Sequence, residues 1–260
     1  MSTALLRQVP WVDLTQLRPH EVLHETLLSA PWLALSLVSA ANHWHVLALP
    51  ASFMFFLTGL RQVHNAFHHS LGLPRWVSDW AMLVLSVLML GSMHAVQVNH
   101  LRHHQHCMAD DDIEAMGARL SALGAILLGP RYPYQLHRKA FEVAALPQQR
   151  WMWLELAANL LWVVAVFWLI DLQALQYHVA AMAAGQCCTA FFAVWTTHHD
   201  CEPNGPIARS IRGRCKALLT YNMFYHFEHH MFPAVPTCKL PILARRIDQV
   251  APDLDLKNVY

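Results

Sequence analysis

The run TLLSAPWLALSLVSAANHWHVLALPASFMFFLTGL, residues 26–60, contains no Asp, Glu, Lys or Arg. A second charge-free run covers residues 172–197, and residues 151–170 carry a single charged side chain, Glu155. Apolar stretches of about 20 residues are typical of membrane-spanning helices. Charged residues make up 13% of the 260-residue chain, whereas soluble domains have about 25%. The sequence therefore predicts an all-α integral membrane protein rather than a soluble helical protein.

The apolar runs divide into two tight hairpins. The first run is long enough for two helices joined at NHWHVLALP, residues 42–50, and the later pair meets at DLQALQ, residues 171–176. We therefore predict four transmembrane helices, over residues 22–41, 46–63, 151–171 and 174–197. Neither hairpin turn contains any of the 18 Lys and Arg residues, so the positive-inside rule places both turns away from the cytoplasm. We expect the remaining regions to share the cytoplasmic face, within a single domain over residues 1–260.

Histidines gather in three short clusters: HNAFHH at 64–69, HLRHH at 100–104 and HFEHH at 226–230. Positions i, i+3 and i+4 of a helix share a face, so the second and third clusters can each aim three imidazoles at one point, and the first can aim two. With 19 histidines in the chain, composition predicts roughly 0.1 such triplets, and two occur. Because neutral imidazole is the commonest metal-binding side chain, we predict that these clusters bind metal.

Eight clustered imidazoles are too many for one ion and suit two. Imidazole binds zinc, copper, iron and nickel, so the ligand type leaves the metal open. A metal pair among membrane helices indicates an apolar substrate, and oxidation of an unactivated C–H bond needs a redox-active metal with dioxygen. We therefore predict two iron ions, with dioxygen as co-substrate. The sequence has no C-x-x-C pair and no Gly-rich phosphate loop, so we expect neither an iron–sulfur cluster nor a nucleotide-binding site. We expect no nucleic-acid partner either.

The three boxes, in this order around apolar hairpins, resemble the integral-membrane fatty acid desaturase and hydroxylase superfamily. YHFEHHMFPAVP, residues 225–236, is similar to that superfamily's third box with its trailing phenylalanine and proline. The resemblance covers residues 64 to about 240. It implies a di-iron, oxygen-dependent enzyme whose boxes face the cytoplasm from a bacterial inner membrane or a reticular membrane. The metal ligands that it implies are His64, His68, His100, His103, His104, His199, His226, His229 and His230.

The resemblance leaves three further positions open. Its additional histidine at the end of the fourth span falls on TTHHDCEP, where His198 is a candidate beside His199. Asn222 matches a position that is often Asn in the superfamily, where it could support a metal-bound water or brace the helix. His69 extends the first box beyond the pattern. We treat His198, His69 and Asn222 as candidates either to bind the metal or to support a ligand.

Acidic residues beside the boxes can offset the charge of the metal by accepting hydrogen bonds from its ligands. Asp110, Asp111, Asp112 and Glu114 follow the second box, and Asp200 and Glu202 follow the fourth span. We expect one or two of these side chains to have this role and the others to form a solvated loop.

Residues 76–98 are apolar enough to span a membrane, with Asp79 as their single charge. A single crossing here would place the first two boxes on opposite faces, where they could not share a metal centre. We therefore expect this segment to lie in the membrane interface or to enter the membrane and return.

The expected activity is oxidation of a lipid-like acyl or alkyl chain to introduce a C=C double bond. No haem-domain or flavin motif is evident, so the electrons need a separate donor, ferredoxin-like or comparable. The basic stretch RSIRGRCK, residues 209–216, either docks an acidic donor or simply follows the positive-inside rule. A hydroxylase or ketolase of alkyl chains or carotenoids is the alternative, since it uses the same ligands. A non-enzymatic metal transporter is more remote, because it requires polar ligands at mid-membrane.

Overall fold

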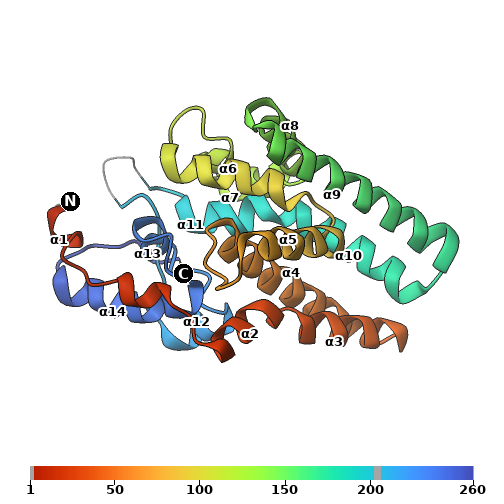
Figure 1. Ribbon diagram of the computed structural model, residues 1–260, viewed down its shortest axis with the longest axis horizontal. Helices are drawn as coiled ribbons and strands as arrows, with labels where there is room; N and C mark the ends of the chain where they lie inside the picture. Colours follow the sequence, from red (N-terminus) through yellow and green to blue (C-terminus); the bar gives the residue numbers. More distant parts are fainter. Residues whose placement is uncertain (1–2, 202–205, 260) are drawn as a thin grey trace.

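The computed structural model describes residues 3–201 and 206–259. Within these residues the chain is helical, and its β structure is one isolated bridge between Ser210 and Asn258. The prediction of an all-α protein is confirmed. In Figure 1 the helical hairpins extend to the right, whereas both termini and the C-terminal helices lie at the left.

Four helical segments are long and apolar enough to cross a membrane, as predicted. They cover Pro19–Ala41, His45–Phe67, Leu146–Ile170 and Gln173–His198. The first comprises α2 (Pro19–Leu27) and α3 (Ala30–Ala41), and the second is α4 (His45–Phe67). The third comprises α9 (Leu146–Val164) and the π-helix η3 (Ala165–Ile170). The fourth comprises α10 (Gln173–Thr189), the π-helix η4 (Ala190–Trp195) and the short α11 (Thr196–His198).

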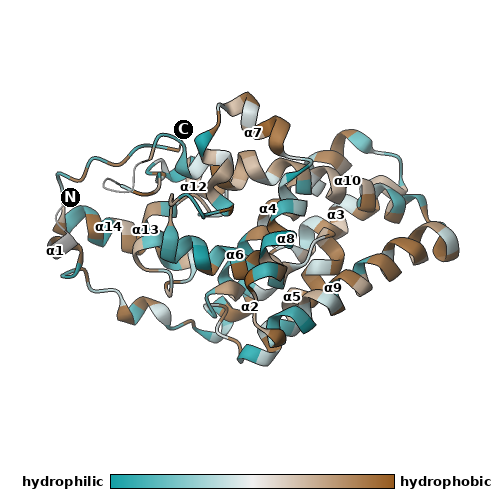
Figure 2. Ribbon diagram, turned by 90° about the horizontal axis from the view of Figure 1, so that it is seen from above, coloured by the Kyte–Doolittle hydropathy of each residue, from teal (hydrophilic) through white to brown (hydrophobic). Residues whose placement is uncertain are grey.

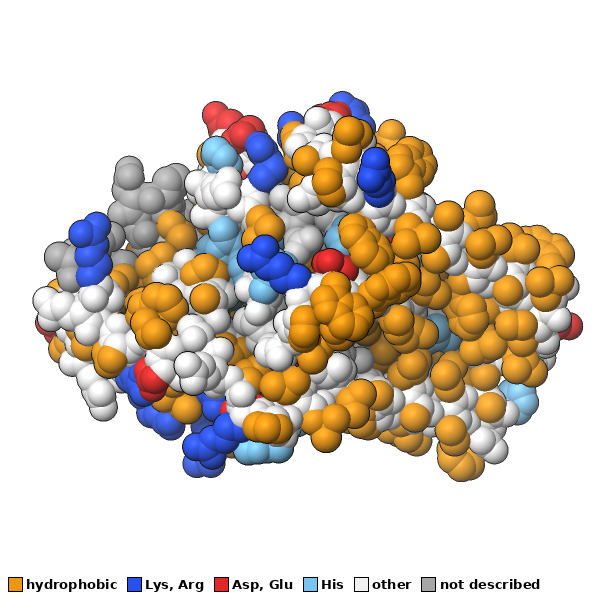
Figure 3. All heavy atoms as spheres, viewed as in Figure 1, with side chains coloured by type: hydrophobic (Ala, Val, Ile, Leu, Met, Phe, Trp, Pro, Cys, Tyr) orange, Lys and Arg blue, Asp and Glu red, His pale blue; other side chains and the backbone are white. Residues whose placement is uncertain are grey.

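The surface of the hairpins is apolar. Trp153, Leu160 and Trp168 on the third span leave 62%, 66% and 73% of their surface exposed. Within an apolar stretch of 18 residues in that span, only 11% is buried inside the protein. Figure 3 shows hydrophobic side chains covering the hairpin end, and in Figure 2 the ribbon of α9 is coloured mostly as hydrophobic residues. Since large apolar patches of this kind need a nonaqueous neighbour, these faces suit contact with lipid.

The segment between the first two boxes forms an elbow. Helix α5 (Arg75–Met89) and helix α6 (Met93–His106) are bent by 111° relative to each other. Leu90 ends α5 in the left-handed conformation, and the side chain of Ser92 begins α6 by accepting a hydrogen bond from Ala95 N at 3.1 Å. His100 of α6 lies 3.0 Å from His68 at the end of α4, Nε2 to Nε2. The bend thus brings the second box back beside the end of α4, as a shared metal centre requires.

The elbow is attached to the third span by a buried carboxylate. Glu155, the single charge of that span, is fully buried and accepts hydrogen bonds from Ser92 Oγ at 2.6 Å and His94 N at 3.1 Å. His94 Nδ1 lies 2.7 Å from its other oxygen. A buried carboxylate is stable only when hydrogen-bonded in this way. Glu155 therefore fixes the start of α6, three turns before its ligand-bearing end.

A second buried network fixes the end of α4. Arg61 contacts both oxygens of Glu25 on α2 at 2.5 Å, and Asn65 donates to Glu25 at 2.8 Å. The side-chain oxygen of Asn65 accepts from Thr237 Oγ1 at 2.7 Å. The last turns of α4, which carry His64, are thus held to two other parts of the chain.

The remaining elements cover the ends of the spans. The central region continues with η2 (Glu114–Arg119), α7 (Ala122–Leu128) and α8 (Tyr132–Val143). The C-terminal elements are α12 (Arg214–Leu219), α13 (His226–Met231), η5 (Thr237–Lys239) and α14 (Leu240–Val250). The N-terminal elements α1 (Thr3–Leu6) and η1 (Val12–Thr15) lie beside them. Leu6 and Leu14 join the buried core that Phe227, Leu243 and Ile247 form in the C-terminal region.

Candidate metal centre

Four separate elements bring nine histidines together. Their rings come from the end of α4, from α6, from α11 and from α13. The nitrogens form two groups, in each of which one atom per residue lies within 4.8 Å of every other. The first group is His64, His68, His100 and His229. The second group is His103, His198, His226 and His230.

The first group joins the first box to the other two. His68 Nε2 lies 3.0 Å from His100 Nε2. The ring of His64 contacts the ring of His229, with centroids 4.0 Å apart. The Nε2 atom of His64 is buried and has no hydrogen-bond partner within the described chain. A buried imidazole nitrogen without a hydrogen-bond partner is available to bind a metal ion.

The second group is buried throughout. Its Nε2 atoms form a chain of contacts from His103 to His198 at 3.1 Å, from His198 to His226 at 2.9 Å, and from His226 to His230 at 3.2 Å. The second and third boxes contribute to both groups, whereas the first box contributes to the first group alone. Each i, i+3, i+4 triplet could aim three rings at one point, but the fold divides both triplets: His100 and His103 belong to different groups, as do His229 and His230.

His104 lies between the two groups. Its Nε2 atom is 2.9 Å from that of His229 and 3.2 Å from that of His100, both in the first group. Its ring is stacked on His230 of the second group, with centroids 4.3 Å apart. The two groups are therefore adjacent, as the two ions of a dinuclear centre require.

The hydrogen bonds of the Nδ1 atoms identify the nitrogens that face the centre. His100 Nδ1 is 2.8 Å from Glu114 Oε1, His103 Nδ1 is 2.7 Å from Asp112 Oδ2, and His198 Nδ1 is 2.8 Å from Ile207 O. Oxygen is the acceptor in each contact, so Nδ1 carries the proton and Nε2 of a neutral ring carries a lone pair. The Nε2 atoms of His103 and His198 lie 3.1 Å apart. A cation between them can accept both lone pairs once His103 has lost its second proton, so the residues fit a metal.

Burial keeps most of these rings neutral. It lowers the pKa of His100, His226, His229 and His230 well below the usual range, and neighbouring imidazoles add to the effect. Burial also acts against a charged His103, but its hydrogen bonds to Asp112 and Cys107 outweigh this and raise the pKa well above 6.5. A metal ion must therefore displace a proton at His103.

The two acidic partners were among the four residues that follow the second box. Asp112 is buried and also accepts from Met108 N at 2.9 Å, whereas Asp110 and Asp111 are exposed. Burial raises the pKa of Glu114 to about 7. The structure therefore gives Asp112 and Glu114 a histidine partner in the centre, in line with the expectation of one or two. Asp200 is exposed, and Glu202 lies outside the described residues.

At the end of the fourth span the structure places His198, and not His199, in the centre. Helix α11 ends at His198, and the backbone turns to an extended conformation at His199, with φ −61° and ψ 141°. The ring of His199 is stacked on Trp195 with centroids 3.8 Å apart, and its Nδ1 atom is 2.7 Å from Trp195 O. His199, assigned as a ligand from sequence, therefore lies outside both groups.

Neither of the other two candidates joins a histidine group. His69 is exposed and follows α4 with φ +53°. Asn222 has φ +61°, and its N–H donates to Ala217 O at 2.7 Å. Asn adopts the left-handed conformation more readily than most residues, so the turn before α13 gives Asn222 a structural role.

Residues 39–257 match the family model for fatty acid desaturases. The chain belongs to the fatty acid desaturase family. The match covers all three boxes and the fourth span, so it confirms the resemblance that the boxes suggested. This desaturase-family protein is therefore an integral membrane protein with the sequence features of an oxidoreductase.

The chain is also similar to a curated enzyme. The beta-carotene ketolase of Paracoccus sp. (strain N81106 / MBIC 01143) is 30% identical over 231 residues, which cover 82% of this chain and 87% of the ketolase. No solved structure matches the chain. The family match and the similarity to the ketolase together indicate that this desaturase-family protein is an oxidoreductase.

One residue near the centre was not anticipated from the sequence. Cys107 Sγ lies 3.9 Å from His103 Nε2, and with Asp112 these residues form a third set of potential ligands. Cys107 follows His103 by four residues, so helical spacing could have indicated that it shares the same face. In this desaturase-family protein it lies beside the second histidine group.

The basic stretch at residues 209–216 is partly engaged inside the protein. Arg209 contacts Asp200 at 3.3 Å, and Arg212 contacts both Glu228 at 2.5 Å and Asp248 at 3.0 Å. Glu228 is fully buried. Two of the four cations thus hold the C-terminal region to the rest of the fold, which favours a structural role for them over a docking role.

Proposed function

We propose that this protein uses two iron ions and dioxygen to oxidise a C–H bond of a lipid-like substrate in the membrane. The observation that carries the proposal is the pair of adjacent histidine groups, with imidazole nitrogens from four elements in mutual reach. His64, His68, His100 and His229 would hold one ion, and His103, His198, His226 and His230 the other. His104, between the groups, is available to either.

Iron is preferred because of the chemistry that the site must support. An all-imidazole site accepts several metals, but zinc has no redox chemistry. Two iron ions would supply activation of dioxygen and removal of hydrogen from an unactivated C–H bond. The protein's own residues bind the ions, and Asp112 and Glu114 orient two of the rings. The apolar spans exclude water from the surroundings of the site.

Two outcomes of the reaction are candidates. Desaturation converts –CH2–CH2–, O2, two electrons and two protons into –CH=CH– and two molecules of water, and family membership supports it. Oxygen insertion converts a C–H bond, O2, two electrons and two protons into C–OH and one water, and repetition at the same carbon gives a ketone. The similarity to a beta-carotene ketolase favours this second candidate.

The proposal also includes the setting of the enzyme. The chain is one domain over residues 1–260, with the histidine boxes facing the cytoplasm, because the hairpin turns carry no Lys or Arg. The electrons come from a separate donor of the ferredoxin type or a comparable carrier. Neither the donor nor dioxygen needs to cross the membrane to reach a site at the cytoplasmic ends of the spans.

The test combines metal analysis with isotope labelling. Protein purified in a mild detergent is expected to contain about two irons per chain. Host cells that express the gene are then grown under ¹⁸O2, and their lipids are compared with those of cells without it. A new unsaturated lipid without ¹⁸O identifies desaturation, and a new hydroxyl or keto product with ¹⁸O identifies oxygen insertion. Stable zinc with full activity, or about one iron per chain, would overturn the di-iron proposal.

A further inference from the structure

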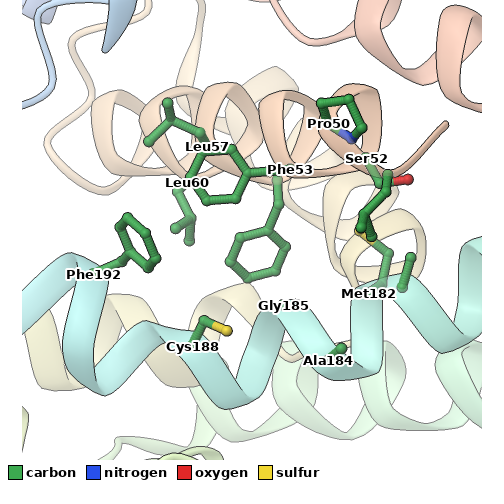
Figure 4. A pocket seen from close by; sticks show the side chains of 13 residues that line it. Pro50, Ser52, Phe53, Leu57, Leu60, Met182, Ala184, Gly185, Cys188 and Phe192 are labelled. Atoms are coloured by element: carbon green, nitrogen blue, oxygen red, sulfur yellow. The ribbon is translucent and has the colours of Figure 1, made fainter. Parts of the chain in front are cut away.

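A cluster of charged and polar side chains lies where α5 and α6 meet the third span. The pocket between α4 and α10, by contrast, has no charged side chain in its wall (Figure 4). In the cluster His94 of α6 lies between two carboxylates: its Nδ1 atom is 2.7 Å from Glu155 Oε1, and its Nε2 atom is 3.6 Å from Asp79 Oδ1 on α5. His94 precedes the ligand candidate His100 by six residues, or about 9 Å along the helix. The cluster is therefore outside the metal centre.

The Nε2 atom of His94 needs a hydrogen-bond donor. Because the Glu155 carboxylate accepts the Nδ1–H, Nε2 of the neutral ring carries a lone pair. His94 is 2% exposed, and its Nε2 atom has no hydrogen-bond partner among the residues that the structure describes. It faces Asp79 Oδ1, which is also an acceptor, and a proton on Nε2 would not join the two atoms, because 3.6 Å is too long for an N–H···O hydrogen bond. A donor that reaches both acceptors would satisfy them.

Two indole rings border this pair of acceptors. Trp151 is stacked on His94, with centroids 4.9 Å apart and ring planes inclined by 5°. Trp80, which follows Asp79 in the sequence, packs edge-on against Trp151 at 5.4 Å. The face of an indole attracts cations. In the described part of the chain, His94 is the ion-pair partner of Asp79, and no Lys or Arg occupies that position. The surroundings therefore favour a cation that carries N–H donors.

The cluster lies at a level that lipid headgroups can reach. Trp151 is in the second turn of the third span. Along α5, Trp76, Trp80 and Val84 form an exposed stripe at helical spacing, and Trp favours the boundary between the hydrocarbon and the headgroups of a membrane. The side chain of Asp79 is 29% exposed. A cation at that boundary can therefore contact Asp79 without crossing the protein.

We propose that this cluster binds the primary ammonium group of a membrane lipid, as in phosphatidylethanolamine, and that the bound lipid joins α5 to α6. An ammonium nitrogen can lie about 2.9 Å from both His94 Nε2 and Asp79 Oδ1 and donate a hydrogen bond to each. Arg150, exposed beside Trp151 in the sequence, suits the phosphate of the same headgroup. A quaternary ammonium, as in phosphatidylcholine, has no N–H to donate. The site is separate from the proposed oxidation and does not depend on it.

Lipid binding to the delipidated protein tests this assignment. The full-length protein in a mild detergent is titrated with phosphatidylethanolamine or phosphatidylcholine of identical acyl chains, and bound lipid is counted by native mass spectrometry. Two charge-assisted hydrogen bonds distinguish the two lipids, so we expect phosphatidylethanolamine to bind roughly tenfold more tightly. Equal affinity of the two lipids would overturn the assignment. Displacement of the bound lipid by free ethanolamine at a similar concentration would also overturn it, because the site would then belong to soluble amines.

A pair of variants locates the preference. Asp79→Asn removes the negative charge and keeps the shape of the side chain, so it should reduce the preference for phosphatidylethanolamine to about twofold or less. Its match is Asp171→Asn, the same change in the exposed turn between the third and fourth spans, which should keep the full preference. An undiminished preference in Asp79→Asn, or an equal loss in both variants, would refute the site.

The outcome is independent of the proposed function. Lipid binding needs neither iron nor turnover, so equal binding of the two lipids would leave the proposed oxidation intact. Absence of an oxidised product in cells would likewise leave the lipid site intact. The comparison of the two lipids on the unmodified protein decides the assignment even where Asp79→Asn folds poorly.

Discussion

Replacement of Asp112 by Asn should remove one of the two metal ions selectively. Asp112 is buried, and its Oδ2 atom accepts from His103 Nδ1 at 2.7 Å and from Met108 N at 2.9 Å. Asn has almost the same shape and keeps one oxygen for the backbone, so the loop after α6 should persist. The ring of His103 loses the negative charge that fixes its orientation and its tautomer. Because His103 belongs to the second group, the damage should be confined there.

The expected size of the effect follows from the role of such partners. Loss of a carboxylate that orients a metal-binding histidine weakens metal affinity by about 10- to 100-fold, which corresponds to about 1.4 to 2.8 kcal/mol. Iron would be measured by mass spectrometry after equilibration with a graded series of chelator concentrations. In the unmodified protein both ions should resist the same chelator range. In Asp112→Asn, one iron should leave at 10- to 100-fold lower chelator strength and the other should remain.

The neighbouring residue provides a matched control. Asp111 is exposed and pairs with Arg102 at 3.1 Å on the surface. Such exposed pairs contribute little to stability, so Asp111→Asn should keep two irons with unchanged affinity. Two tightly held irons in Asp112→Asn would refute the role assigned to this carboxylate. Equal loss of both ions in Asp112→Asn would show that the two groups do not behave as separate sites.

Three further predictions concern other parts of the molecule. His198→Ala should reduce iron to about one per chain and abolish oxidation, whereas His199→Ala should keep both; the reverse pattern would restore the assignment made from sequence. Glu155→Ala leaves the buried donors of Ser92 and His94 without a partner, so it should destabilise the protein by roughly 3 kcal/mol; an unchanged melting temperature in detergent would contradict this. Cys107 and Cys215, each kept as a single cysteine in sealed vesicles, should react with an impermeant thiol reagent from the same side, and labelling from opposite sides would mean that the elbow crosses the membrane.

The features of the fold that depend only on local interactions can be predicted from the sequence. Transfer of a 20-residue apolar helix into lipid depends on the segment itself, so residues 26–60 and 172–197 identify membrane helices without reference to the rest of the chain. The spacing of His226, His229 and His230 likewise places three rings on one helical face through backbone periodicity alone. Even the elbow at residues 76–98 could be anticipated, because a shared metal centre forbids a single crossing there.

Tertiary structure decided which rings lie together in one group. Spacing puts His100 and His103 on the same face of α6, but other elements determine the ring that each one meets: His68 at 3.0 Å for the former and His198 at 3.1 Å for the latter. The choice of His198 over His199 depends on where α11 ends, and helix ends are among the least predictable features of a sequence. The path of the loop after α6 brings Asp112 to His103 and leaves Asp111 at the surface. Such pairings join residues up to 165 positions apart, as in His64 and His229, and no local pattern encodes the direction in which two distant helices meet.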